Sequence, residues 1–185
     1  MIVGSLSRRY AKAMLEVAIK LGKVDAIGRE LEDIASVVHG SPELQSALAS
    51  PVFKASQRKK IMEELATRRG LSKEVKTFLA LLADRERINA LTGIARELRT
   101  LVDAHLGRVR ATVTSAKPLA PDQEARIRTA IEKQTGKQVL LERKEDAALI
   151  GGLITQIGDV VYDGSVKSQL EEMKETILKE EQHFA

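Results

Sequence analysis

The spacing of apolar residues changes at residue 107, and this change limits the folds open to the chain. Before it, apolar side chains recur every three or four residues along six segments, the period of helices with one buried face. After it, the stretch RVRATVTS at residues 108–115 alternates apolar and polar side chains, the period of a half-buried strand. The sequence therefore predicts an α+β protein in two parts, residues 1–106 and 107–185.

Glycine and proline mark the ends of the predicted helices in the first part. Gly22 and Gly70 each follow a segment with helical periodicity, where a left-handed C-cap is expected. Pro42 follows Ser41, the usual order of a first helical position after an N-cap. Helices joined by such short connections pack antiparallel. Residues 1–106 are therefore predicted to form an N-terminal six-helix bundle.

The second part is predicted to combine strands and helices. Residues 117–137 return to a helical pattern, and QVLLER at residues 138–143 is typical of a second strand. Four glycines then stand among β-branched residues in the segment 150–166, which we interpret as one or two further strands ending in a turn at DGS, residues 163–165. A last amphipathic helix completes a small α+β C-terminal domain.

The glycine-rich segment is also a candidate phosphate-binding loop, but its residues do not fit one. Such a loop needs G-x-x-x-x-G-K-[ST], in which the lysine contacts the phosphates and the hydroxyl holds magnesium. Gly152 and Gly158 are six residues apart, and Asp159 follows where the lysine belongs. A carboxylate there would repel a phosphate. Close approach of another backbone, or a bulge in a strand, explains the glycines better.

The remaining side chains indicate neither catalysis nor metal binding. The three histidines are widely separated, and none belongs to a spaced ligand motif. Neighbouring carboxylates such as Glu63 and Glu64 lie in predicted helices and point in different directions, so they cannot act as an acid/base pair. Cysteine is absent, which excludes thiolate sites. We therefore expect no enzyme, cofactor or metal site.

The net charge of +4 raises the alternative of a nucleic-acid-binding protein. The positive excess lies in residues 1–105, with 18 Lys and Arg against 13 Asp and Glu. These charges alternate in sign, however, and two tyrosines, three phenylalanines and no tryptophan offer little for base stacking. Four neighbouring basic residues fit either an acidic partner surface or a solvated helix face: Lys54, Arg58, Lys59 and Lys60.

Nothing in the sequence predicts a membrane span. The longest apolar-looking run without charge covers residues 147–158, which is too short to cross a bilayer. The N-terminal stretch lacks the apolar core of a secretory signal. We therefore expect a soluble chain that meets a membrane at most as a peripheral protein.

Four stretches of the sequence together point to a known family: RRYAKAMLEVA at 8–18, FLALLADRERINAL at 78–91, VRATVTSAKPL at 109–119 and GGLITQIGDVVYDGSVKSQL at 151–170. They resemble the delta subunit of F-type ATP synthases, the relative of the mitochondrial oligomycin-sensitivity-conferring protein. They occur in the order found in that family and cover nearly the whole chain. A general helical adaptor, the main alternative, has no reason to carry the last two stretches together.

The resemblance implies a noncatalytic stator subunit of the peripheral stalk, in one copy per complex. Its helical bundle, residues 1–106, would bind N-terminal segments of the alpha subunits in the catalytic head. Its C-terminal domain, residues 107–185, would bind the end of the b-subunit stalk, so that rotor torque drives ATP synthesis. It would be peripheral to the cytoplasmic face of the bacterial plasma membrane, or to the equivalent face of an energy-transducing organelle membrane.

The resemblance also implies two sets of site residues. The alpha-subunit groove lies between the first and fifth helices of the family, at positions matched by Tyr10, Ala13, Met14, Val17, Phe78, Leu79 and Leu82. Each of these fits a groove or the bundle core, because apolar periodicity does not separate the two. The C-terminal signature falls on residues expected to shape strand and turn: Gly151, Gly152, Gly158, Asp163, Gly164 and Ser165. We expect this domain to be looser than the bundle, since uncovered apolar surface would await a partner helix.

Overall fold

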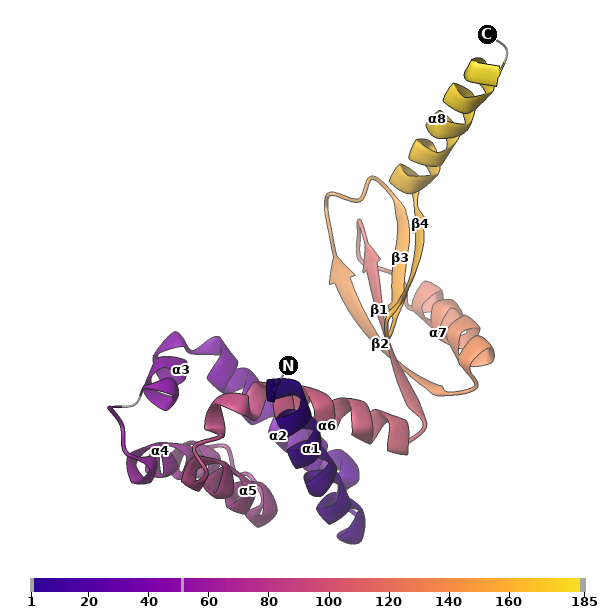
Figure 1. The fold of residues 1–185 in the computed structure, drawn as a ribbon. Coiled ribbons are helices and arrows are strands. Elements are labelled where there is room, and N and C mark those ends of the chain that lie inside the picture. Colours follow the sequence, from indigo (N-terminus) through magenta and orange to yellow (C-terminus); the bar gives the residue numbers. More distant parts are fainter. Residues whose placement is uncertain (1, 51, 184–185) are drawn as a thin grey trace. The chain divides into compact units, whose positions relative to one another are not determined.

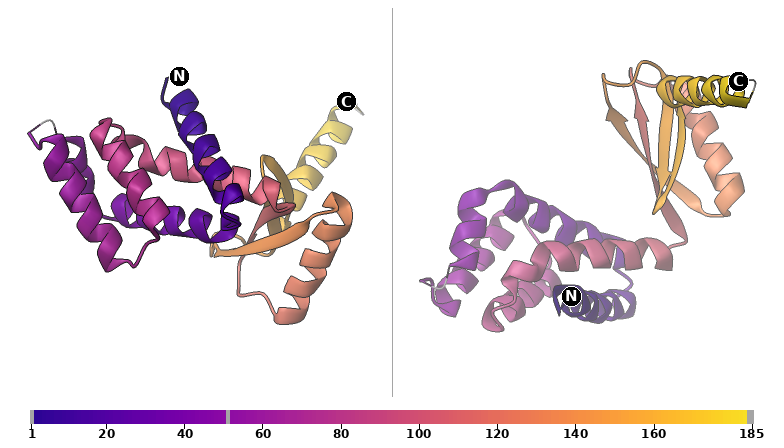
Figure 2. Two further views of the ribbon diagram at one scale, coloured as in Figure 1. Left: turned by 90° about the horizontal axis from the view of Figure 1, so that it is seen from below. Right: turned by 45° about the horizontal axis from the view of Figure 1, so that its top comes forward.

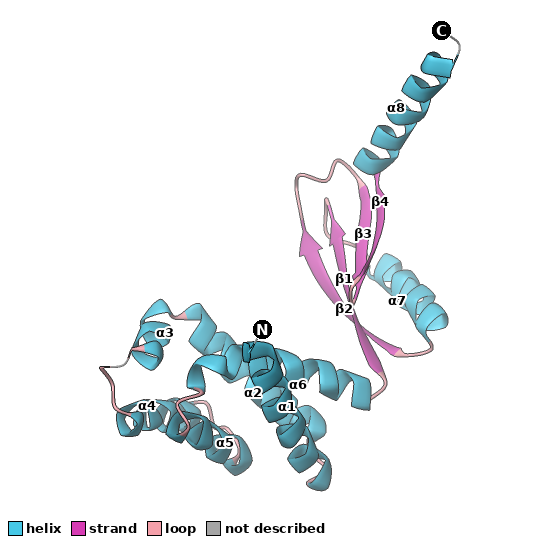
Figure 3. Ribbon diagram, in the orientation of Figure 1, coloured by secondary structure: helices cyan, strands magenta, loops and turns pink. Residues whose placement is uncertain are grey.

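The computed structural model describes residues 2–50 and 52–183, with side chains described over 4–50 and 52–174. The chain divides between His105 and Leu106 into two compact units (Figure 1). The α+β prediction is confirmed: the described residues form eight α-helices and one four-stranded sheet (Figure 3). Six of the helices lie in the first unit, and two accompany the sheet in the second.

The first unit, in its described residues 2–50 and 52–105, contains helices and no strand. In chain order its elements are α1 (Ile2–Lys20), α2 (Val24–Gly40), α3 (Pro42–Ala49), α4 (Ala55–Arg68), α5 (Lys73–Asp84), the short 3-10 helix η1 (Ile88–Ala90) and α6 (Leu91–His105). Helices α1 and α2 pack against α6, and α4 packs against α5. Gly22 and Gly70 adopt φ of 64° and 65° two residues after the last residues of α1 and α4, and the Ser41 hydroxyl accepts the Leu44 N–H at the start of α3. The expected caps are therefore present.

The core of this unit lies where α2 and α6 cross α1. Its fully buried side chains include Ile27, Leu31 and Ile34 of α2 and Leu91, Ile94 and Leu98 of α6. Two helical glycines permit the close approach. A Cβ on Gly28 would lie 3.3 Å from Val102, and a Cβ on Gly93 would lie 2.8 Å from the Ser7 hydroxyl of α1. Small residues at these crossings thus let α6 serve as the central helix.

The second unit places one helix on a twisted sheet. Its elements are β1 (Arg108–Ser115), α7 (Pro121–Thr135), β2 (Gln138–Glu145), β3 (Gly152–Ile157), β4 (Val160–Ser165) and α8 (Val166–His183). The strand order is β2-β1-β3-β4, with β1 and β2 parallel and the other pairs antiparallel. Helix α7 connects the parallel pair and lies along one face of the sheet (Figure 2). There it buries Ile131 against Ala111 and Val139.

The position of the turn within the glycine-rich segment corrects the sequence prediction. Asp163, Gly164 and Ser165 belong to strand β4, and they pair with β3 instead of forming a turn. The two strands reverse at Gly158 and Asp159, where Gly158 adopts a left-handed φ of 59°. The DGS sequence resembles a turn because its residues favour turns. Here those residues form a direct joint between β4 and α8 instead.

Candidate partner-binding surfaces

The first candidate surface lies where α1 meets α5. The Tyr10 ring packs edge-on against the Phe78 ring, with centroids 6.3 Å apart and an interplanar angle of 66°. The Lys23 ammonium pairs with the Glu74 carboxylate at 3.3 Å, joining the end of α1 to the start of α5. Lys23 itself lies in the turn between α1 and α2. The aromatic pair and this ion pair therefore hold α5 against α1 and the turn that follows it.

The structure separates the seven groove candidates into core and surface. Four are buried within the unit, with exposed fractions of 8% or less: Met14, Phe78, Leu79 and Leu82. Tyr10 is half-buried, whereas Ala13 and Val17 are exposed. Tyr10, Ala13 and Val17 stand at i, i+3 and i+7, so they share one side of α1. These three remain the accessible part of the predicted site.

One accessible residue of this surface was missed by the sequence prediction. Leu81 of α5 is 43% exposed, the same fraction as Val17. It stands three residues after Phe78, so it extends the apolar surface one turn along α5. The core stripe of α5 contains Phe78, Leu79 and Leu82, and Leu81 is out of phase with it. We call Tyr10, Ala13, Val17, Phe78 and Leu81 the α1–α5 face.

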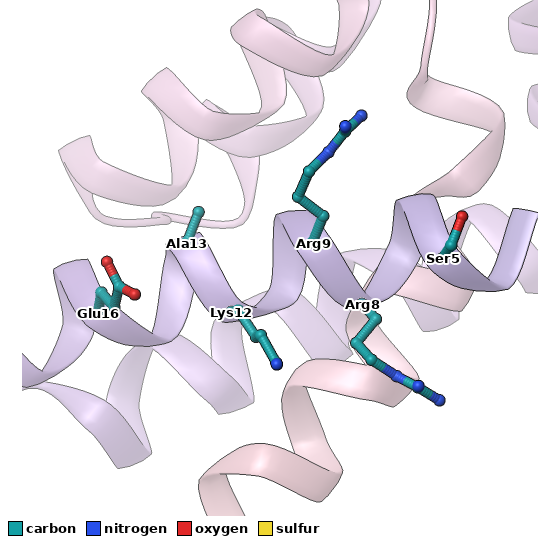
Figure 4. A pocket seen from close by; sticks show the side chains of 6 residues that line it. All are labelled: Ser5, Arg8, Arg9, Lys12, Ala13 and Glu16. Atoms are coloured by element: carbon teal, nitrogen blue, oxygen red, sulfur yellow. The ribbon is translucent and has the colours of Figure 1, made fainter.

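A shallow hollow adjoins this face on α1. It has a volume of about 440 Å³, and its lining residues are Ser5, Arg8, Arg9, Lys12, Ala13 and Glu16 (Figure 4). Arg9 and Ala13 point to the same side of α1, whereas Arg8 and Lys12 point to the other. The Arg9 guanidinium lies 5.9 Å from the centre of the Tyr10 ring. Positive charge therefore stands at the edge of the α1–α5 face.

The four basic residues near the start of α4 do not form a single basic surface. Arg58 is only 8% exposed, and its Nε donates a 3.0 Å hydrogen bond to the Phe53 carbonyl oxygen. The Lys59 ammonium pairs with the Asp84 carboxylate at 3.0 Å. Lys54 and Lys60 are exposed. Two of the four thus stabilise the unit itself, which weakens the interpretation of this cluster as a docking surface.

The second candidate surface comprises exposed apolar residues of β4 and α8. Strand β4 is at the edge of the sheet, and Val160, Val161 and Tyr162 are 53%, 57% and 46% exposed. Successive strand residues point to opposite faces, so Val160 and Tyr162 lie on the face that carries α7, where the Gln134 amide donates a 3.1 Å hydrogen bond to the Tyr162 hydroxyl, and Val161 lies on the other. On α8, Val166, Leu170 and Met173 are 37%, 55% and 62% exposed. Their spacing of i, i+4 and i+7 places these three on one stripe of the helix. The exposed apolar residues expected in this unit are therefore present; we call this set the β4–α8 face.

The signature residues form the joint that carries α8. The Asp163 carboxylate accepts hydrogen bonds from the Ser165 N–H and the Ser168 hydroxyl, both at 2.8 Å. The Ser165 hydroxyl accepts the Ser168 N–H at 3.2 Å, which caps the first turn of α8. A Cβ on Gly152 would collide with the Gly164 carbonyl oxygen and lie 2.8 Å from the Ser165 Cα. These residues therefore fix where α8 leaves the sheet.

The joint gives stability in the second unit a specific pH dependence. The backbone N–H of Ser165, followed by the Ser168 and Ser165 side chains, lowers the pKa of the Asp163 carboxyl below its ordinary value of 3.8. A depressed pKa in the folded state contributes stability above the unfolded pKa, and this contribution is lost as the pH falls through the folded value. The joint should therefore weaken only below about pH 4.

Asp163→Asn is expected to remove this contribution, because an amide accepts hydrogen bonds but does not titrate. The urea midpoint of the second unit, measured at pH 6 and pH 3, should fall less on acidification in Asp163→Asn than in the wild type. The other carboxylates titrate equally in both proteins, so the difference isolates Asp163. Equal falls in the two proteins would show that the Asp163 hydrogen bonds do not favour its ionised form.

The described residues offer neither a metal site nor a membrane span. Across residues 4–50 and 52–174, whose side chains are described, no group of His, Cys, Asp and Glu side chains is arranged to hold a metal ion. Among the helices described over residues 2–50 and 52–183, none combines the length and apolar character that crossing a bilayer requires. What the described residues do present is two apolar faces, one on each unit. The fold and these faces are typical of the class of proteins that bind other chains through exposed apolar surfaces.

Comparison with known proteins identifies the family. The family model described as "ATP synthase delta (OSCP) subunit" matches residues 6–177. The chain is 42% identical over 177 residues to an ATP synthase subunit delta of Anaeromyxobacter dehalogenans, covering 96% of this chain and 99% of that one. It is 40% identical over 176 residues to the subunit delta of Myxococcus xanthus, with coverage of 94% and 97%. The chain therefore belongs to the ATP synthase delta (OSCP) subunit family.

A solved structure shows the same fold. A chain in the cryo-EM structure of the Toxoplasma gondii mitochondrial ATP synthase hexamer matches with a TM-score of 0.69 and 22% sequence identity. The match covers 94% of this chain and 97% of that one. The arrangement of a helical unit followed by an α+β unit is thus shared across a large divergence in sequence.

Proposed function

We propose that this chain is the noncatalytic stator subunit that links the alpha/beta catalytic head of an F-type ATP synthase to its b-subunit stalk. By holding the head against the turning rotor, it lets proton-driven torque be used for ATP synthesis. Membership of the delta (OSCP) family carries the proposal. The two exposed apolar faces, one on each unit, are the arrangement that a link between two partners requires. One copy acts in each complex, on the cytoplasmic side of the bacterial plasma membrane or its organellar equivalent.

The head contact is proposed for the α1–α5 face. Tyr10, Ala13 and Val17 present an accessible apolar strip on α1, and Leu81 presents another on α5. An amphipathic helix binds such a surface by placing its own apolar residues at i, i+3, i+4 and i+7 along it. An alpha-subunit N-terminal segment is therefore the proposed occupant. Phe78 supports this face through the Tyr10 ring instead of being exposed itself.

The stalk contact is proposed for the β4–α8 face. Leu170 and Met173 are more than half exposed, which is costly for a surface that stays in water. Their helical spacing fits the C-terminal end of the b subunit as a partner helix. The joint of Asp163, Ser165 and Gly152 supports this contact, because it fixes the direction in which α8 and its apolar stripe leave the sheet.

Calorimetric titration tests the head contact. The full chain is titrated with a synthetic peptide of the alpha-subunit N-terminus encoded in the same genome. The wild type should bind one peptide per chain, and Val17→Asp should raise the dissociation constant at least about tenfold by burying a charge in the interface. Ile19→Asp is the matched control, since Ile19 is 42% exposed on α1 but does not share the side of Tyr10 and Val17.

The possible outcomes separate the contact from the fold. Both variants should retain the helical circular dichroism and melting temperature of the wild type, because both residues are more than two-fifths exposed. Equal weakening by Val17→Asp and Ile19→Asp would move the contact away from the α1–α5 face. No binding to the folded wild type would remove the alpha-subunit contact from the proposed function.

A further inference from the structure

The hollow on α1 is continuous with the α1–α5 face through two shared residues. Ala13 belongs both to the apolar strip and to the lining of the hollow. Arg9 also lines the hollow, while its guanidinium lies against Tyr10 of the strip. Because the alanine side chain is a single methyl group, a neighbouring side chain can pass over it. A helix on the α1–α5 face can therefore extend one side chain into the hollow.

The charges around the hollow determine which kind of partner side chain it can bind. Three of its lining residues are basic, Arg8, Arg9 and Lys12, against the single carboxylate of Glu16. The Arg8 Nε already pairs with Glu97 of α6 at 3.5 Å. Arg9 and Lys12 are exposed, and within the described part of the chain neither forms an ion pair. The net field over Ala13 is thus positive and open to an anion.

We propose that the docked alpha-subunit helix places an acidic side chain over Ala13, where the carboxylate pairs with the Arg9 guanidinium. Lys12 strengthens the positive field from the other side of the hollow. Glu16, one turn further along α1, repels a carboxylate and so limits the acidic residue of the partner to the end of the hollow that holds Arg9 and Lys12. The hollow therefore sets the register of the helix that the apolar strip binds. This inference rests on the proposed head contact, and it adds the charge that the partner must carry.

Charge reversal tests the inference in the same titration. Arg9→Glu turns attraction into repulsion, so we expect it to raise the dissociation constant of the peptide about tenfold at low salt. Arg9→Lys keeps the positive charge, so it should raise the dissociation constant much less than Arg9→Glu does. Lys60→Glu is the matched control, because it makes the same change of charge at an exposed position on α4. It should change the dissociation constant by less than about twofold.

The peptide and the salt dependence complete the test. Replacing the acidic residues of the peptide with their amides should weaken binding to the wild type but not to Arg9→Glu. Binding to the wild type should weaken between 50 and 500 mM salt, more steeply than binding to Arg9→Glu, since screening acts on the ion pair. Filling the hollow with Ala13→Leu should also weaken binding.

The outcomes distinguish the inference from the proposed function. If Val17→Asp abolishes binding while Arg9→Glu leaves it unchanged, the head contact stands, and the inference that an acidic side chain of the partner pairs with Arg9 is wrong. If Arg9→Glu and Lys60→Glu weaken binding equally, the effect is one of net charge and the hollow plays no part. If the folded wild type does not bind the peptide, both the head contact and this inference are overturned.

Discussion

Replacing Gly152 with alanine is expected to destabilise the second unit by about 3 to 5 kcal/mol. Gly152 adopts a φ of 83°, a backbone conformation that residues other than glycine rarely adopt. Its Cβ would also collide with the Gly164 carbonyl oxygen and lie 2.8 Å from the Ser165 Cα. Both are backbone atoms of β4, and Gly152 pairs with Ser165 in the ladder. Relief therefore requires β3 and β4 to separate, which disturbs the joint that carries α8.

Gly158→Ala is the control for backbone strain alone. Gly158 also has a positive φ, 59°, but a Cβ there would meet no atom within 4 Å. Its cost should be the left-handed conformation only, about 1 to 2 kcal/mol. Urea unfolding of the full chain measures both variants, and hydrogen exchange of β3 and β4 locates the loss. Similar losses of unfolding free energy at the two positions would mean that β4 shifts easily to accommodate the added Cβ. Close contact with β4 would then not explain why residue 152 is glycine.

The period of the apolar residues predicts the elements well because it reports which side of each element is buried. The change of period at residue 107 falls next to the boundary between His105 and Leu106. The helical pattern of residues 117–137 contains α7, which ends before Gly136 at a φ of 65°. Such features depend on neighbours in the sequence, so the sequence is enough to find them.

Features that depend on neighbours in space are less accessible from sequence. DGS has the composition of a turn, but pairing with β3 holds it in a strand and Ser168 completes its hydrogen bonds. Leu79 and Leu81 are both leucines on α5, yet only contact with the other helices separates the buried one from the exposed one. The α1–α5 face likewise needs two helices that are distant in the sequence, which explains why only the structure separates Tyr10, Ala13 and Val17 from the buried candidates and adds Leu81.

Leu79→Asp and Leu81→Asp are expected to have opposite consequences, although they are the same substitution two residues apart. Leu79 is 1% exposed, so its replacement buries an unpaired carboxylate in the core of the first unit. The loss should be about 5 kcal/mol or more, comparable to the whole stability of a small domain. Leu81 is 43% exposed, and an aspartate there remains in water. Its effect on stability should stay within about 0.5 kcal/mol.

For peptide binding, Leu81→Asp is the informative variant, because it stays folded and Leu79→Asp does not. Leu81→Asp keeps the folded first unit but places a carboxylate on the α1–α5 face, so it should raise the dissociation constant of the alpha-subunit peptide at least about tenfold. Leu79→Asp should show reduced helical circular dichroism, so any loss of peptide binding in this variant reports unfolding and not the loss of a contact. Thermal melts together with titrations separate the two cases. A folded Leu81→Asp that binds like the wild type would confine the contact to α1, because Leu81 is the exposed apolar residue that α5 contributes to this face.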